Sequence, residues 1–335
     1  MRSPLRPMAG AGCAVALAVT GCSAQATGAP RAAVSSAAPA PATSTAYTPY
    51  VSATEAAATD SAGSPAAYNL AFVVSGGSGC TPKWNGTEAI ADSAVTARIS
   101  ALKKKGAGVR VSFGGASGKE LAAACDSVSD LAAAYGEALD AAGSDEADFD
   151  IEGDELTDSA SVGLRSRAIA RLQEERPDLE VSFTLPVMPS GLDPDGLALL
   201  ESANTYDVQV STVDLMTMNY GESYGGDMGD YAVTSATAAH AQLKRVFGLS
   251  DAHAWRGMAL TSMIGVNDVS GETFTLSDAG QVRTFAERKG VAWVSMWSTF
   301  RDRECEAGRS ERDDAAPDCS GVSQSPGAFA RRFSG

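Results

Sequence analysis

Short apolar segments alternate with longer segments of helical periodicity along most of this 335-residue chain. The apolar segments that have the length and composition of strands span residues 68–75, 109–114, 148–152, 180–185, 213–218, 258–263 and 291–297. Tyr50 and Val51 provide a candidate eighth strand. Strands that alternate with helices usually form parallel sheets covered on both faces, so this pattern admits few architectures.

The segments between the strands are predicted helices near residues 93–105, 119–140, 158–176, 192–205, 231–247 and 277–289, with a last one near residues 323–333. Asp158 and Ser277 occupy N-cap positions, and Gly106, Gly248 and Gly290 stand where helices end. Eight strand and helix units require about 250 residues. We therefore predict a single (β/α)8 TIM barrel, with a doubly wound sheet as the alternative.

Acidic and apolar side chains alternate between Asp148 and Glu152. On a strand, the period of two places Asp148, Asp150 and Glu152 on one face. A half-buried strand facing water would show the same alternation, but in a parallel barrel this face points into the interior. Buried carboxyl groups persist only where they share protons, hydrogen bond to one another or bind a metal. The strand is therefore a candidate catalytic element, with a carboxylate metal site as a further alternative.

Catalytic groups of such barrels lie at the C-terminal ends of the strands. The unusual residues at the predicted strand ends are Gly114, Gly115, Glu152, Asn219, Tyr220 and Trp297. Their convergence on one end of the barrel predicts an active site there. A phosphate-binding loop at residues 113–120 is excluded, because Phe113 replaces its first glycine and Glu120 its Ser or Thr.

The charge balance argues against nucleic acid as a partner. The chain has 41 acidic and 26 basic side chains and a formal net charge of −15. Surfaces that bind nucleic acid or anionic lipid carry an excess of Lys and Arg. A neutral polymer or a small molecule fits this composition better.

The first residues of the chain have the pattern of an export signal. Arg2 and Arg6 precede an apolar run at residues 8–19, which is too short to span a membrane. The run leads into Cys22 and resembles a bacterial lipoprotein signal, in which that cysteine is acylated. We expect residues 1–22 to be a signal peptide of the lipoprotein type, with plain secretion as the alternative.

Residues 23–45 consist largely of Ala, Pro, Ser and Thr and are expected to form a disordered tether, followed by the barrel at 46–335. The cysteines of this exported domain are Cys80, Cys125, Cys305 and Cys319. They predict two disulfides. Of the three possible connectivities we expect Cys80 with Cys125 and Cys305 with Cys319. A zinc site is not expected, because no two cysteines are close in sequence.

The acidic strand resembles that of family 18 glycoside hydrolases, the chitinase family. Asp145 begins the family pattern D-x-x-D-x-D-x-E, which ends at Glu152, and residues 112–115 match its S-x-G-G on the third strand. Trp297 resembles the tryptophan of the family's eighth strand. The match spans roughly residues 68–302 and is most similar to secreted chitinase-like proteins of actinobacteria.

The resemblance implies a retaining hydrolysis in which the N-acetyl oxygen of the substrate is the nucleophile. Glu152 would be the general acid, Asp150 would share a proton with it and orient the N-acetyl group, and Asp148 would support Asp150. Trp297 would form the apolar floor under the sugar. The reaction needs no cofactor and no metal.

The sixth strand departs from the family pattern. The family's tyrosine that holds the N-acetyl oxygen is replaced by Met218, so we assign this role to Tyr220, two residues on. The residues expected to bind or shape the substrate site are Trp297, Asn219, Met216, Gly114, Gly115 and Trp84. Of these, the glycines are expected to shape a strand end, and Trp84 to stack on a sugar from a loop.

The interval 263–291 is expected to hold one helix and nothing more, without the small α+β domain that some family members insert there. An open cleft and endo-type cleavage of chitin or N-acetylglucosamine oligosaccharides follow as expectations. The alternatives are an endo-β-N-acetylglucosaminidase acting on N-glycans and a chitin-binding barrel without activity, which the presence of Glu152 disfavours. We expect an extracellular monomer that meets the membrane only through a lipid on Cys22.

If Cys22 is acylated, the mature protein will begin at this cysteine and carry the mass of the lipid. Mass spectrometry of the mature N-terminus measures both properties. An unmodified N-terminus beyond residue 22 would show that the chain is released without an anchor.

Overall fold

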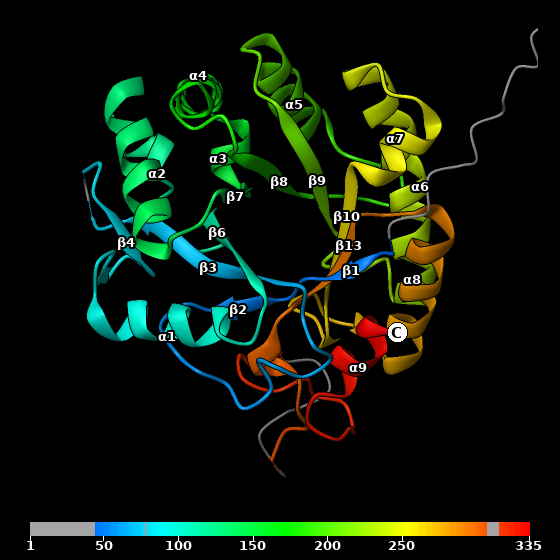
Figure 1. Cartoon of the computed structure of the whole chain (residues 1–335). Helices are drawn as coiled ribbons and strands as arrows, with labels where there is room; N and C mark the ends of the chain where they lie inside the picture. Colours follow the sequence, from blue (N-terminus) through cyan, green and yellow to red (C-terminus); the bar gives the residue numbers. More distant parts are fainter. Residues whose placement is uncertain (1–43, 78, 307–314) are drawn as a thin grey trace, which may run out of the picture. The chain divides into compact units, whose positions relative to one another are not determined.

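The computed structural model describes residues 44–77, 79–306 and 315–335 (Figure 1). The predicted signal peptide, Cys22 and most of the predicted tether lie outside the described residues. The tether was expected to reach residue 45, but Thr45 is buried and its hydroxyl donates to the carbonyl of Val291 (2.9 Å). The folded domain therefore includes Thr45.

The described residues form a closed barrel with eight parallel strand positions (Figure 1). The first position is shared by β1 (Ala46–Tyr47) and β2 (Tyr50–Ser52). The others are β3 (Ala67–Ser75), β6 (Gly108–Gly114), β7 (Glu146–Asp150), β8 (Glu180–Pro186), β9 (Val210–Met216), β10 (Met258–Met263) and β13 (Trp293–Trp297). Because β1 pairs with β13 and β2 pairs with β3, the sheet has no free barrel edge. The predicted TIM barrel is confirmed, and the doubly wound alternative is wrong.

Helices cover the outside of the barrel (Figure 1). The longer ones are α1 (Ser93–Lys103), α2 (Val128–Ala142), α4 (Ser159–Glu175), α5 (Pro194–Thr205), α6 (Met228–Phe247) and α8 (Leu276–Lys289). The shorter ones are η1 (Leu121–Ala123), α3 (Asp154–Thr157), α7 (Asp251–Arg256), η2 (Thr299–Arg301) and α9 (Ala328–Ser334). In the described parts of the chain no helix is both long and apolar enough to cross a membrane.

Most helix ends follow the capping residues, with three changes from the prediction. Helix α1 ends at Lys103 with Lys104 as its cap, before the predicted Gly106. Asp158 caps α4 as expected, and α6 and α8 end at Gly248 and Gly290 in left-handed conformation. The cap of α8 is Thr275 and not Ser277. Helix α2 begins only after its cap, Ser127, since the preceding residues form the short turn η1.

The strands divide a polar interior from an apolar outer layer. On β7, Phe149 faces outward, where its ring packs on Phe113 (5.3 Å between centroids) and Tyr135 (5.0 Å). Asp148 and Asp150 alternate with it and are also buried, so they face the barrel interior. The apolar layer thus forces two carboxyl groups inward.

Two short hairpins extend the barrel. Strands β4 (Pro82–Trp84) and β5 (Glu88–Ala89) add antiparallel pairs beside β3. Strands β11 (Gly265–Val266) and β12 (Thr273–Phe274) pair between β10 and α8. The expectation that residues 263–291 hold one helix and nothing more is therefore wrong, although no α+β domain is inserted there.

Both predicted disulfides are confirmed. Cys80 bonds to Cys125, which lies 45 residues on, and ties the loop after β3 to the end of η1. Cys305 bonds to Cys319, 14 residues on.

We expect the longer disulfide loop to stabilise the domain more, because closing it removes more entropy from the unfolded chain. Replacing Cys80 and Cys125 by Ala is expected to lower the free energy of unfolding by about 4 kcal/mol, and replacing Cys305 and Cys319 by about 3 kcal/mol. Urea unfolding of the two double variants measures both values. Unchanged stability in either variant would contradict the expectation.

Candidate active site

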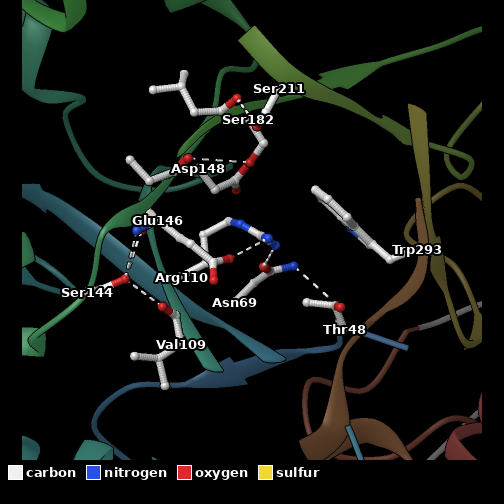
Figure 2. A network of polar contacts seen from close by, with 12 residues as sticks. Thr48, Asn69, Val109, Arg110, Ser144, Glu146, Asp148, Ser182, Ser211 and Trp293 are labelled. Atoms are coloured by element: carbon white, nitrogen blue, oxygen red, sulfur yellow. Dashed lines mark hydrogen bonds and ion pairs between the residues drawn. The ribbon is translucent and has the colours of Figure 1, made fainter. Parts of the chain in front are cut away.

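Asp148 lies at the base of the site, and both of its carboxylate oxygens accept hydrogen bonds. Its Oδ2 accepts from the hydroxyls of Tyr50 (2.9 Å) and Ser112 (2.6 Å). Its Oδ1 accepts from Ser182 (2.8 Å) and Thr184 (2.9 Å). These donors come from three strands, β2, β6 and β8, and they hold the carboxylate in one orientation. Figure 2 shows Asp148 and Ser182 next to the polar network of the interior.

Asp150 and Glu152 form a hydrogen-bonded carboxyl pair at the end of β7. Burial raises the pKa of Asp150 well above its usual range, and the charges of Glu152 and Asp148 raise it further. Burial also raises the pKa of Glu152 to about 6, against the lowering effect of its bond to Asp150, and the charge of Asp268 adds to the rise. Because each carboxyl affects the other, the pair binds protons as a unit. It keeps a proton at a pH where ordinary carboxylic acids have lost theirs.

Strand β7 ends at Asp150, so Glu152 stands two residues beyond the strand rather than on it. It nevertheless lines the same cavity, which has a volume of about 200 Å³. The other lining residues are Tyr50, Phe72, Ala116, Ser117, Asp150, Thr184, Met216, Met218, Asn219, Thr261, Met263, Asp268 and Trp297. Met216, Asn219 and Trp297, which were predicted to bind the substrate, are among these lining residues.

Aromatic rings form one wall of the cavity. The Trp297 ring stacks on Phe72 with 5.4 Å between centroids, and meets Tyr50 edge-on at 5.9 Å. The Ala71–Phe72 and Trp297–Ser298 peptide bonds are both cis. The Tyr50 hydroxyl in this wall is directed to Asp148.

Gly114 and Gly115 allow the end of β6 to approach the acidic strand. Both have positive φ angles, +99° and +84°. A Cβ atom on Gly114 would clash with the Asp150 carbonyl, and one on Gly115 would lie 2.8 Å from the Phe72 ring. The amide of Gly115 donates to the Asp150 carbonyl (2.8 Å). The glycines therefore position Asp150 and Phe72, and neither lines the cavity itself.

An exposed polar pair lines the cavity at the ends of β9 and β10. Asn219 Nδ2 donates to Asp268 Oδ2 (3.2 Å), and the Asp268 amide donates to Asn219 Oδ1 (3.1 Å). This contact joins the loop after β9 to the loop after β10. Glu272 supports the first loop, because its buried carboxyl accepts from the Gly221 amide (2.8 Å).

The prediction that Tyr220 faces the substrate is wrong. Strand β9 ends at Met216, and Asn219 has a φ of +54°, so the alternation of faces does not continue to residue 220. The Tyr220 ring is buried, and its hydroxyl accepts from Ser235 of α6 (3.4 Å). The residue therefore anchors this loop to α6.

The prediction for Trp84 is also wrong. The indole is fully buried in β4, and its Nε1 donates to the carbonyl of Ile90 (3.3 Å). It belongs to the apolar core and has no surface for stacking on a sugar.

Several site residues were missed in the sequence. On β8, Ser182 and Thr184 alternate with the outward Val181 and Phe183, just as the acids on β7 alternate with apolar residues. This period of two would have predicted that both hydroxyls face the barrel interior. Asp268 lies on a loop, where no periodic pattern could have indicated it.

A larger cavity, of about 840 Å³, lies between residues 52–59 and a segment around Phe300 and Arg303. It contains none of the motif carboxyls, so the smaller cavity is the candidate site.

Among the described residues, no group of three His, Cys, Asp or Glu side chains is arranged to hold a metal ion. The hydroxyl donors already occupy both oxygens of Asp148.

Comparison with curated proteins gives two relatives that are each 37% identical over 249 residues. One is a probable bifunctional chitinase/lysozyme of Escherichia coli strain K12, and the other is endochitinase 11 of Metarhizium anisopliae. The alignments cover 70% of this chain but only 28% and 47% of those proteins, so the chain spans less than half the length of either relative. No family model matches the chain.

Among solved structures, active domain 2 of the chitinase from Pyrococcus furiosus superposes with a TM-score of 0.77 at 27% identity, covering 88% of this chain and 95% of that one. A putative chitinase A from Streptomyces coelicolor, with a TM-score of 0.51 and 15% identity over 76% of this chain and 92% of that one, shares the fold. With the acidic motif placed at the end of β7 in a closed barrel, these similarities show that the chain belongs to the chitinase family, glycoside hydrolase family 18.

Proposed function

We propose that this chain is a chitinase that hydrolyses β-1,4 linkages between N-acetylglucosamine units. The observation that carries the proposal is the pair of carboxyls, Asp150 and Glu152, that lines one cavity together with Trp297 and whose pKa values burial raises. The names of the relatives support the substrate class. A structure of the Pyrococcus furiosus chitinase domain contains chito-oligosaccharides.

Glu152 is proposed as the general acid. A general acid must hold its proton near the working pH and release it to the leaving oxygen. The raised pKa of Glu152, about 6, meets the first requirement. Its position beyond the strand end, only partly buried, leaves the carboxyl within reach of a bound glycosidic oxygen.

Asp150 is proposed to bind the N-acetyl group of the substrate. The N–H of this N-acetyl group would donate to the Asp150 carboxylate. The N-acetyl carbonyl oxygen would then attack the anomeric carbon, while the glycosidic oxygen leaves with the proton of Glu152. The resulting cyclic oxazolinium ion would be hydrolysed by a water that Glu152 deprotonates, which retains the configuration. Asp148 would stabilise this arrangement without moving, because four hydroxyl groups hold it.

Endo-type cleavage is part of the proposal. Between β10 and α8 the chain carries only the β11–β12 hairpin and its loop. This small insertion supports an open cleft in which a long polymer can bind along its length.

We also propose that the enzyme acts outside the cell, secreted or anchored through Cys22. The signal-like N-terminus and the two disulfides support this location, because disulfides persist mainly in oxidising compartments.

The wild-type chain is expected to cleave soluble chitin oligosaccharides at internal linkages and to leave a high-mannose glycoprotein intact. Glu152→Gln keeps the size of the side chain but cannot donate a proton, so turnover should fall by about 10²–10⁴ while oligosaccharide still binds. Chromatography of the products and calorimetric titration of the variant measure the two effects.

Asp154→Asn is the matched control, because Asp154 is exposed on α3 just beyond the motif and should keep full activity. Release of glycans without cleavage of chitin would favour an endo-β-N-acetylglucosaminidase. Full activity of Glu152→Gln would contradict the assignment of the general acid.

Asp268→Asn is expected to move the pH profile of kcat/KM toward lower pH. The negative charge of Asp268 raises the pKa of Glu152, so its removal makes the carboxyl pair easier to deprotonate. Both limbs of the profile should shift down, by about half a pH unit at an exposed position. An unchanged profile, or a shift to higher pH, would show that Asp268 has no such effect.

A further inference from the structure

A third acidic side chain lies in the barrel interior below the site. Asp214, on β9, precedes the cavity-lining Met216 by two residues and is buried on the same face of the strand. Its Oδ2 accepts from Thr261 Oγ1 (2.8 Å) and Trp293 Nε1 (3.2 Å). Its Oδ1 is buried and has no hydrogen-bond partner among the described residues. The mechanism above gives this group no role.

The register of the sheet places Asp214 near the catalytic pair. Asp150 of β7 pairs with Thr184 of β8, and Thr184 pairs with Asp214 of β9. Asp214 and Asp150 are thus two strands apart at one level of the sheet, which corresponds to about 10 Å. At this distance, and with an effective dielectric constant of about 20, one charge changes a proton affinity roughly tenfold. The charge of Asp214 is among those that raise the pKa of Asp150, and it is not among those that raise the pKa of Glu152.

The surroundings of Asp214 favour its neutral form at acidic pH. Burial, followed by the charge of Asp148, raises the pKa of Asp214 to about 7, although the bonds from Thr261 and Trp293 oppose the rise. An unbonded buried oxygen is less costly on a neutral acid than on a carboxylate. Asp214 therefore changes charge in the range in which the catalytic pair works.

The titratable and charged groups that act on this part of the interior come from three other strands. They are Tyr50 of β2, Arg110 of β6, and Asp148 and Asp150 of β7. From β10 and β13, the uncharged Thr261 and Trp293 contact the carboxyl.

Arg110 is already engaged by other groups. It donates to Asn69 (2.8 Å) and Glu146 (2.6 Å), and its guanidinium carbon lies 4.2 Å from the centre of a Trp293 ring (Figure 2). The indole thus contacts both Arg110 and Asp214, and no ion pair joins the arginine to Asp214. The charge of Arg110 still lowers the pKa of Asp214, but less than burial raises it, and the charge of Asp214, once formed, acts on Asp150.

We propose that Asp214 is a positioning residue that decides whether the proton shared by Asp150 and Glu152 rests on Glu152. With Asp214 neutral, Asp150 can ionise and the proton occupies Glu152, where it can be donated. When Asp214 ionises, its charge draws the proton to the nearer Asp150 and leaves Glu152 unable to act as an acid. The inference rests on the role proposed for Glu152.

Asp214→Asn tests this, because the amide is always neutral and can still accept at one atom. The kcat of the variant should equal that of the wild type within about twofold near pH 6, and exceed it about threefold near pH 8. The wild-type profile should contain a step near pH 7 that the variant lacks. A variant-to-wild-type ratio that is the same at every pH would overturn the proposal, since a purely structural role gives that result.

Infrared spectroscopy provides a measurement that does not depend on activity. A protonated-carboxyl band should titrate near pH 7 in the wild type and be missing in Asp214→Asn. If the wild type is active on chitin and this band is absent, the proposal fails while the proposed function stands. If the band is present and chitin is not cleaved, the proposed function fails.

A second variant covers the case in which Asp214→Asn does not fold. Trp293→Phe removes one donor to the Asp214 carboxylate, so the step should move to higher pH. Asp278→Asn is the matched control, because Asp278 is buried in the cap of α8, outside the barrel interior. This control should leave the step in place, and a step that stays unchanged in Trp293→Phe would contradict the proposal.

Discussion

The site depends on the hydrogen bonds that the Asp148 carboxylate accepts. A buried carboxylate costs several kcal/mol unless donors occupy its oxygens. Here four hydroxyl groups do so, and they come from strands far apart in the sequence. Tyr50 can reach Asp148 because the first strand lies between β13 and β3 and closes the barrel. The closure that completes the fold therefore also completes the base of the active site.

A fixed Asp148 determines how the remaining acids behave. Its oxygens are occupied, so the partner that remains for Asp150 is Glu152. Because two adjacent buried carboxylates repel each other, the two groups do not both ionise easily, and the pair keeps a proton. Two strands from Asp150 in the sheet, Asp214 adds a further charge that depends on pH. The proton binding of Asp150 therefore depends on the charges of both Glu152 and Asp214.

The fold and the acidic pair could be predicted because both depend on local periodicity. Strands of period two, helices between them and an acid at every second position identify the barrel and place Asp148 and Asp150 inside it. The disulfide pairing was also predicted correctly, because each bridge joins two cysteines that follow one another in the folded domain, 45 and 14 residues apart.

The sequence predictions that failed concern residues beyond the ends of strands. Beyond Met216 the left-handed Asn219 breaks the alternation, so Tyr220 turns under α6 and Met218 stays in the cavity lining. Asp268 reaches the rim only through a contact between two loops, 49 residues from Asn219 in sequence. Trp84 was assigned to an exposed loop, but the hairpin of β4 and β5 buries it. These placements depend on turns and long-range contacts that no periodic pattern encodes.

If Asp150 and Glu152 act together on the N-acetyl group of the substrate, the first product keeps the configuration of the anomeric carbon. Proton NMR during hydrolysis of a chitin oligosaccharide should show the β-anomer first, followed by slow mutarotation. An α-anomer at the earliest times would contradict this joint role of Asp150 and Glu152. It would mean that a water attacks directly, with a separate base such as Asp268, the other carboxyl in the cavity lining.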